Sequence, residues 1–257
     1  MKYYVNMVLS CPVILNNEKE SIGDIDLSLA PLGFQPDNYQ PDNRINYIGS
    51  YFNATTKEDA LHQATKKFEK FSTNLSYTLN QPVQLDINQS TIQEYADDGK
   101  ISINTNVLFM GTTIANDIKL NEIKTKLIQC ISKKHPLTPL RFYNEGLQSK
   151  STFEKFTKFY KILEFYHKND TDEWIKKNIP KIKTHISTIK NRAKNGSHRK
   201  KITELTYIRH KLSHGSRGKY LRTPLLESNP KDVKLVEDNL EIIKGLAKKT
   251  MDSHNRK

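Results

Sequence analysis

The chain has 257 residues and a formal net charge of +13, with 41 Lys and Arg against 28 Asp and Glu, and 36% of it is hydrophobic. This composition can bury a core, and it excludes a fibrous or wholly disordered chain. The apolar segment 3–15 contains two polar residues and a proline, so we expect neither an export signal nor a membrane span. The cysteines Cys11 and Cys130 suggest no disulfide framework, and we expect a soluble cytoplasmic protein.

Residues 1–116 have the pattern of a small α+β domain. A helix is predicted over 55–77, with Thr55 or Thr56 as its cap, because apolar residues recur there at helical spacing. The segment 28–43 holds three prolines and several Asp and Asn, which is typical of a long loop. Short apolar stretches bounded by turn residues predict strands at 2–9, 45–54, 81–87 and 100–109.

Beyond Asn116 the apolar period becomes helical and stays so. Helices are predicted at 120–131, 137–147, 151–168 with Ser151 as cap, 202–212, and from Pro230 with Asn229 as cap. A further helix is predicted to begin at Pro180, because Ile182, Ile186, Ile189 and Ala193 share one helical face. The predicted fold class is therefore α+β, with a domain at 1–116 followed by an all-α up-and-down helical bundle at 117–257.

The positive charge is concentrated in the C-terminal part. Residues 1–116 hold 8 Lys and Arg against 13 Asp and Glu, whereas residues 117–257 hold 33 against 15. Clustered Lys and Arg favour a nucleic-acid partner, because binding to phosphates releases counterions. A compositional bias toward Lys, Asn and Ile is the alternative explanation.

The segment 202–215 carries the candidate chemistry. Arg209 is followed by four residues and then by His214, with Gly215 next. Arginine can hold a phosphate through two parallel hydrogen bonds and stabilise developing negative charge, and histidine can transfer a proton near neutral pH. The structural alternative is that both cations lie in a last helical turn, where they meet the negative end of the helix dipole.

This stretch resembles the signature of HEPN domains, in which an Arg and a polar residue are followed after a few residues by a His. Here Arg209, His210 and His214 occupy those positions. The resemblance implies a homodimeric helical bundle that cleaves RNA without a metal ion, leaving cyclic-phosphate and 5′-hydroxyl ends. It further implies that His214 moves the proton, that Arg209 stabilises the transition state, and that His210 holds the phosphate or the partner's arginine. The biological setting it implies is antiviral defence or toxin-like control of RNA.

Further residues are candidates for the same site. Glu164 lies on a predicted helix and could orient Arg209 or His214, although a solvated or salt-bridged glutamate is the alternative. We expect no metal and no cofactor, because His210 and His214 have no third ligand nearby in the sequence. The candidates for gripping the RNA backbone are Lys190, Arg192, Lys194, Arg199, Lys200, Lys201 and Lys211.

Other functions stay open at this stage. The bundle could bind RNA without cutting it, or it could serve only as a dimeric interaction module. The N-terminal domain carries no recognisable chemical motif, and sensing, autoinhibition and recruitment of a regulatory partner protein all remain alternatives.

Overall fold

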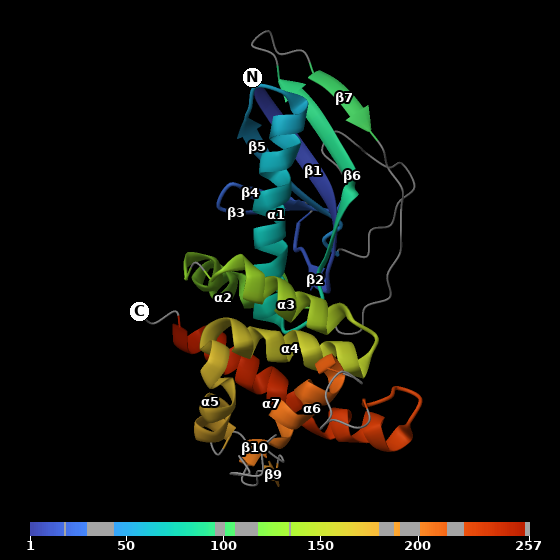
Figure 1. Cartoon of the computed structure of the whole chain (residues 1–257). Coiled ribbons are helices and arrows are strands. Elements are labelled where there is room, and N and C mark those ends of the chain that lie inside the picture. Colours follow the sequence, from blue (N-terminus) through green and yellow to red (C-terminus); the bar gives the residue numbers. More distant parts are fainter. Residues whose placement is uncertain are drawn as a thin grey trace. The chain divides into compact units, whose positions relative to one another are not determined.

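The computed structural model of the chain describes residues 1–17, 19–29, 44–95, 101–105, 118–133, 135–179, 188–190, 201–214 and 224–254. The chain divides into two compact units, Met1–Lys134 and His135–Lys257. The first unit is rich in strands and the second consists mainly of helices, which confirms the predicted mixed architecture at this level (Figure 1). Within the described residues, no helix is long and apolar enough to cross a membrane.

The first unit is built around a six-stranded antiparallel sheet. Its strand order is β3-β4-β5-β1-β6-β7. Three predicted strands correspond to β1 (Lys2–Ser10), β5 (Tyr47–Asn53) and β7 (Ile101–Thr105). The strand predicted at 81–87 covers only the first part of β6 (Gln84–Tyr95), and β3 (Lys19–Ile22) and β4 (Ile25–Ser28) were not predicted. Two short strands, β2 (Val13–Ile14) and β8 (Ile118–Lys119), pair in parallel beside it. The predicted loop at 28–43 lies almost entirely outside the described residues.

Helix α1 (Lys57–Leu79) covers one face of this sheet (Figure 1). Thr56 caps the helix by accepting a hydrogen bond from the backbone N–H of Asp59 at 3.1 Å. The predicted apolar face is confirmed, since its five members are at most 2% exposed: Ala60, Ala64, Phe68, Phe71 and Leu75. They pack against alternate residues of β1, which are Tyr3, Val5, Met7 and Leu9.

Helix α2 (Leu120–Ser132) completes the core of the first unit. Its apolar residues Leu120, Ile123 and Leu127 belong to the same buried cluster as α1 and the sheet. The structural boundary therefore falls between Lys134 and His135 rather than at Asn116. Helical periodicity alone could not indicate with which unit this helix packs.

The second unit is organised around α4 (Thr152–His167), which contacts each of the other helices. These are α3 (Leu137–Gln148), α5 (Thr171–Asn178), α6 (Glu204–His214) and α7 (Pro230–His254). Ser151 caps α4 as predicted, accepting from the N–H of Glu154 at 3.1 Å. The buried side of α4 holds Phe153, Phe156, Tyr160 and Leu163 from the predicted stripe.

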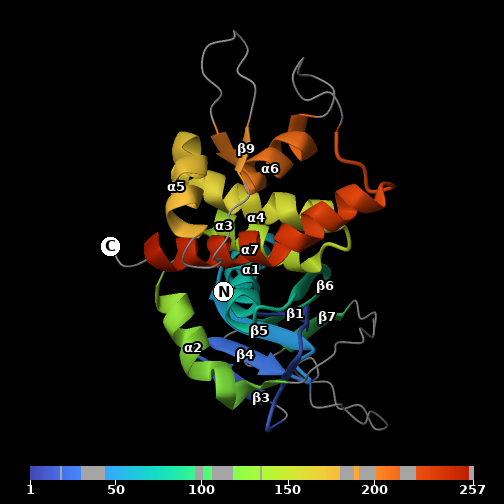
Figure 2. The same cartoon turned by 90° about the horizontal axis from the view of Figure 1, so that it is seen from below.

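The helix predicted from Pro180 was wrong for the part of it that the structure describes. Thr188–Lys190 form strand β9, which pairs antiparallel with β10 (Lys201–Thr203). Figure 2 shows β9 beside α5 and α6, and both helices contact the strand pair. The β-branched residues Thr188 and Ile189 suit a strand, and their non-local pairing with β10 outweighs the helical spacing of the isoleucines.

Candidate functional site

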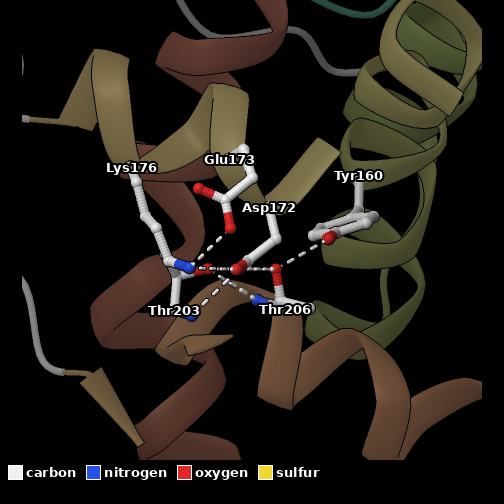
Figure 3. Close-up of polar contacts among 6 residues, drawn as sticks. All are labelled: Tyr160, Asp172, Glu173, Lys176, Thr203 and Thr206. Atoms are coloured by element: carbon white, nitrogen blue, oxygen red, sulfur yellow. Dashed lines mark hydrogen bonds and ion pairs between the residues drawn. The ribbon is translucent and has the colours of Figure 1, made fainter. Parts of the chain in front are cut away.

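The start of α6 is anchored by the carboxylate of Asp172, from α5. Its Oδ1 accepts hydrogen bonds from the backbone N–H of Thr203 at 2.9 Å, from the Thr203 hydroxyl at 2.8 Å and from the Thr206 hydroxyl at 2.6 Å. Its Oδ2 lies 2.8 Å from Nζ of Lys176. Figure 3 shows these contacts meeting at the one carboxylate, with Tyr160 of α4 joined through Thr206 at 3.0 Å.

This network combines a helix cap with a buried charge. The Thr203 hydroxyl accepts a hydrogen bond from the N–H of Thr206 at 3.2 Å, so Thr203 caps α6. The negative charge of Asp172 lies near the N-terminus of α6, where it interacts favourably with the positive end of the helix dipole. Burial raises the pKa of Asp172, but hydrogen bonds from Lys176, Thr206 and Thr203 outweigh it and lower the pKa below its usual value. Asp172 therefore remains ionised at neutral pH and fixes the end of β10 and the start of α6.

Six residues after this cap, Arg209 of α6 pairs with Glu164 of α4. The Arg209 Nε lies 2.7 Å from the Glu164 Oε1, and the two side chains are 23% and 33% exposed. The structure therefore brings Glu164 to Arg209, and this ion pair fits both hypotheses for Glu164, that it orients Arg209 and that it is a salt-bridged glutamate. The contact uses one of the five N–H donors of the guanidinium.

The structure leaves the two candidate reacting groups on one continuous helix. Arg209 and His214 both belong to α6, which remains helical through His214. Five residues on an ideal helix correspond to about 140° between side-chain directions. The side chain of His214 lies outside the described residues. His210 is partly buried on the same helix.

The residues predicted to bind the RNA backbone lie in different parts of the helical unit. Lys211 is only 8% exposed, and its Nζ lies over the ring of Tyr207 at 5.7 Å from the centroid, so it is poorly placed to grip a phosphate. Lys190 of β9 and Lys201 of β10 pair directly with each other, at one end of the strand pair. Outside the described residues lie Arg192, Lys194, Arg199 and Lys200.

A second cluster of polar and aromatic side chains lies at the C-terminal end of α4. The His167 ring stacks on Trp174 with centroids 4.3 Å apart, and its Nε2 lies 3.2 Å from the hydroxyl of Thr250. Burial, together with the neighbouring His254, lowers the pKa of His167 to about 4, against the opposing effect of Asp170. His167 is therefore a neutral packing residue at physiological pH.

Sequence reasoning missed Asp172, Thr203 and Thr206. The only local signal was a threonine just before a helical apolar pattern, which is typical of a cap. Asp172 is 31 residues away from Thr203, and no periodicity links them. Across the described part of the chain, no three His, Cys, Asp or Glu residues gather as a metal site would require.

Comparison with known proteins gives one match, to a family model. The model described as methylamine utilization protein MauJ matches residues 139–252, which is less than half of the chain and lies within the helical unit. No curated protein and no solved structure matches the chain. The expected membership of the HEPN superfamily is therefore wrong. Its motif consists of one Arg and one His a few residues apart, a pattern common by chance in a chain with 8 histidines.

Proposed function

We propose that the protein binds RNA through its helical unit. The observation that carries this proposal is the separation of charge between the two structural units. Residues 135–257 contain 28 Lys and Arg against 13 Asp and Glu, whereas residues 1–134 contain 13 against 15. The whole positive excess therefore belongs to one compact unit, and such a unit gains binding free energy by releasing counterions from a phosphate backbone.

The segment between β9 and β10 is the proposed centre of this binding. Six of the twelve residues 190–201 are Lys or Arg, and the segment is joined to α6 directly after β10. Asp172 holds the end of β10 by accepting two hydrogen bonds from Thr203. Because Lys190 pairs directly with Lys201, the basic segment begins and ends at the same end of the strand pair.

A salt titration of RNA affinity tests this proposal. Fluorescence anisotropy with a labelled single-stranded RNA would compare wild type with Lys200→Gln/Lys201→Gln. Two lost phosphate contacts should weaken binding on the order of tenfold and flatten the salt slope by about 1.4. The matched control, Lys231→Gln/Lys234→Gln, removes equal charge from exposed positions on α7. Equal effects of the two double substitutions would show that RNA binding depends on overall charge and is not centred on residues 190–201. The absence of salt-dependent RNA affinity in the wild type would refute the proposal.

A second proposed function is metal-independent RNA cleavage, and the Glu164–Arg209 ion pair favours it. Glu164 holds the guanidinium of Arg209 at Nε, so its orientation is set before a phosphate binds. Donors that are oriented in advance stabilise the negative charge of a transition state most effectively. His214 would act as the general acid or base. Because side chains five residues apart on an ideal helix point about 140° apart, we propose that cleavage requires a homodimer, with Arg209 of one copy acting beside the partner's His214.

Complementation distinguishes cleavage from binding alone. Arg209→Ala and His214→Ala are each expected to lose activity in EDTA while retaining their folds. If the site combines residues of two copies, mixing the two variants would form heterodimers with one intact site each and restore about a quarter of wild-type activity. Product bearing cyclic-phosphate ends would identify the reaction. Intact RNA with the wild type would leave binding as the function, and activity without recovery on mixing would contradict the composite site.

A further inference from the structure

Five aromatic rings form a continuous row at the C-terminal end of α4. Phe165 meets Tyr166 edge-on at 5.1 Å between centroids, and Tyr166 packs on His254 of α7 at 4.5 Å. The ring of His254 lies 5.3 Å from that of His167, which stacks on Trp174 of α5 at 4.3 Å. Figure 1 shows α5 and the C-terminal end of α7 at this same end of α4. Three helices therefore contribute to one aromatic row.

None of these five rings is buried, which distinguishes them from the earlier aromatic residues of α4. Phe165 is 41% exposed and His254 is exposed, while the other three rings are partly exposed. By contrast, the aromatic residues in the first part of α4 are at most 9% exposed: Phe153, Phe156, Phe159 and Tyr160. Core packing explains the first part of the helix but not the aromatic row. Adjacent aromatic rings that stay accessible are typical of a binding surface.

Exposed lysines flank the aromatic row. Lys161 lies one turn before Phe165 on α4, and its Nζ lies over the ring of Phe142 of α3 at 5.4 Å from the centroid. Lys168 forms the C-terminal cap of α4, and Lys177 lies in the last turn of α5. Rings and cations thus follow one another along this surface. Sites that bind single-stranded nucleic acid combine these two features, because the rings stack on bases and the cations attract the phosphates.

The charge within the row differs from the charge beside it. His167 is neutral at physiological pH, and the carboxylate of Asp170 acts on it. This part of the row therefore suits an uncharged planar group more than a phosphate. The lysines on either side supply the attraction for a negatively charged backbone.

We propose that the aromatic row stacks the bases of single-stranded RNA while the flanking lysines hold the backbone. This proposal rests on the RNA binding proposed for the helical unit and identifies the form of RNA that the unit prefers. Bases in a duplex are stacked on one another, so their faces are inaccessible to protein rings. Every base has a face that can stack, so we expect little dependence on base sequence.

The fluorescence of Trp174 tests the row directly, because it is the only tryptophan of the chain. An unlabelled single-stranded RNA added to the full-length protein should change the Trp174 emission in parallel with binding measured by anisotropy. A duplex of the same sequence can bind only through its phosphates and should leave the emission unchanged. An unchanged emission at saturating single-stranded RNA, or an equal change with the duplex, would overturn the proposal.

Substitution of Phe165 tests the stacking itself. Phe165→Ala should weaken binding of single-stranded RNA by about 5- to 150-fold, as for the loss of one stacked base. The salt slope should stay the same, because no charge is removed. Phe165→Tyr keeps an aromatic face and should bind as the wild type does. The matched control, Leu226→Ala, removes another exposed apolar side chain of the helical unit and should leave the affinity unchanged.

The outcomes separate this proposal from the proposed function. Absence of salt-dependent RNA affinity in the wild type would refute RNA binding, and base stacking with it. Affinity that Lys200→Gln/Lys201→Gln weakens and Phe165→Ala leaves unchanged would refute base stacking alone. Sedimentation velocity identifies another occupant of the surface. A wild-type dimer that Phe165→Ala dissociates would assign the row to an interface between copies of this chain and overturn base stacking.

Discussion

Replacing Asp172 should be among the most damaging changes in the helical unit. The side chain is 14% exposed, and its Oδ1 accepts two hydrogen bonds from Thr203, which is fully buried, and one from Thr206, which is 6% exposed. Hydrogen bonds to a charged group contribute about 1.5–3 kcal/mol, and a buried donor without a partner costs about 1–3 kcal/mol. Asp172→Ala should therefore cost about 3–4 kcal/mol, and Asp172→Asn about half as much, because the amide oxygen can still accept.

The single tryptophan of the chain allows the loss of stability in Asp172→Ala to be measured by fluorescence. Trp174 is two residues from Asp172 on α5 and stacks on His167, so its fluorescence during urea unfolding reports the helical unit. The matched control is Asp170→Ala, an exposed acidic residue beside the same helix, and should change the stability by less than about 0.5 kcal/mol. A cost below about 1 kcal/mol for Asp172→Ala would refute the role of this network as an anchor.

The pH dependence provides a second check on the same residue. The pKa of Asp172 is lower in the folded protein than the usual value of about 3.9. The unfolded chain therefore binds the proton more readily, and the stabilisation is present above that usual value and lost as the pH falls through the folded-state pKa. The stability difference between wild type and Asp172→Asn should accordingly shrink below about pH 4. A difference that stays constant down to pH 2 would contradict the assigned pKa shift.

Three further predictions follow from particular contacts. Because burial lowers the pKa of His167 to about 4, stability of the helical unit should fall as the pH drops from about 6.5 toward 4, and His167→Phe should flatten that dependence in urea titrations at pH 7 and 5. Gly146→Ala should cost about 1–3 kcal/mol by thermal unfolding, because the new Cβ would lie 2.9 Å from the ring of Phe159; an unchanged midpoint would show that the ring can move. Burial raises the pKa of Cys11 to about 12, so a thiol reagent should modify it only after denaturation, and rapid native labelling would contradict its burial.

The long helices were predictable because local signals agree with their packing. In α1 the cap at Thr56 and the apolar spacing from Ala60 to Leu75 both match the structure. The α7 start at Pro230 was predicted for the same reason, with Asn229 accepting from the N–H of Lys231 at 3.1 Å. In such helices, the local sequence signals agree with the structure that tertiary packing stabilises.

Elements that depend on distant partners were not predictable. Strand β9 has three residues and exists through its pairing with β10, so the helical spacing of Ile182, Ile186 and Ile189 misled the prediction. Strands β3 and β4 are four residues each, too short for alternation to be distinctive. At the site, residue chemistry suggested Glu164 beside Arg209, but nothing in one sequence relates Asp172 to Thr203.

The role of α6 follows from its dependence on neighbouring elements. A helix of 11 residues is only marginally stable by itself, because the free-energy cost of nucleating it is offset by few backbone hydrogen bonds. Here α5 holds its first turn through Asp172, and α4 holds it twice, through Tyr160 at Thr206 and through Glu164 at Arg209. The chain from the basic residues 190–201 to Arg209 is thus held at both ends by an acidic side chain. Asp172 holds it at Thr203, and Glu164 holds it at Arg209. Any ligand that draws Arg209 away from Glu164 must also strain this packing, so RNA affinity and the stability of α6 should change together in variants of Glu164.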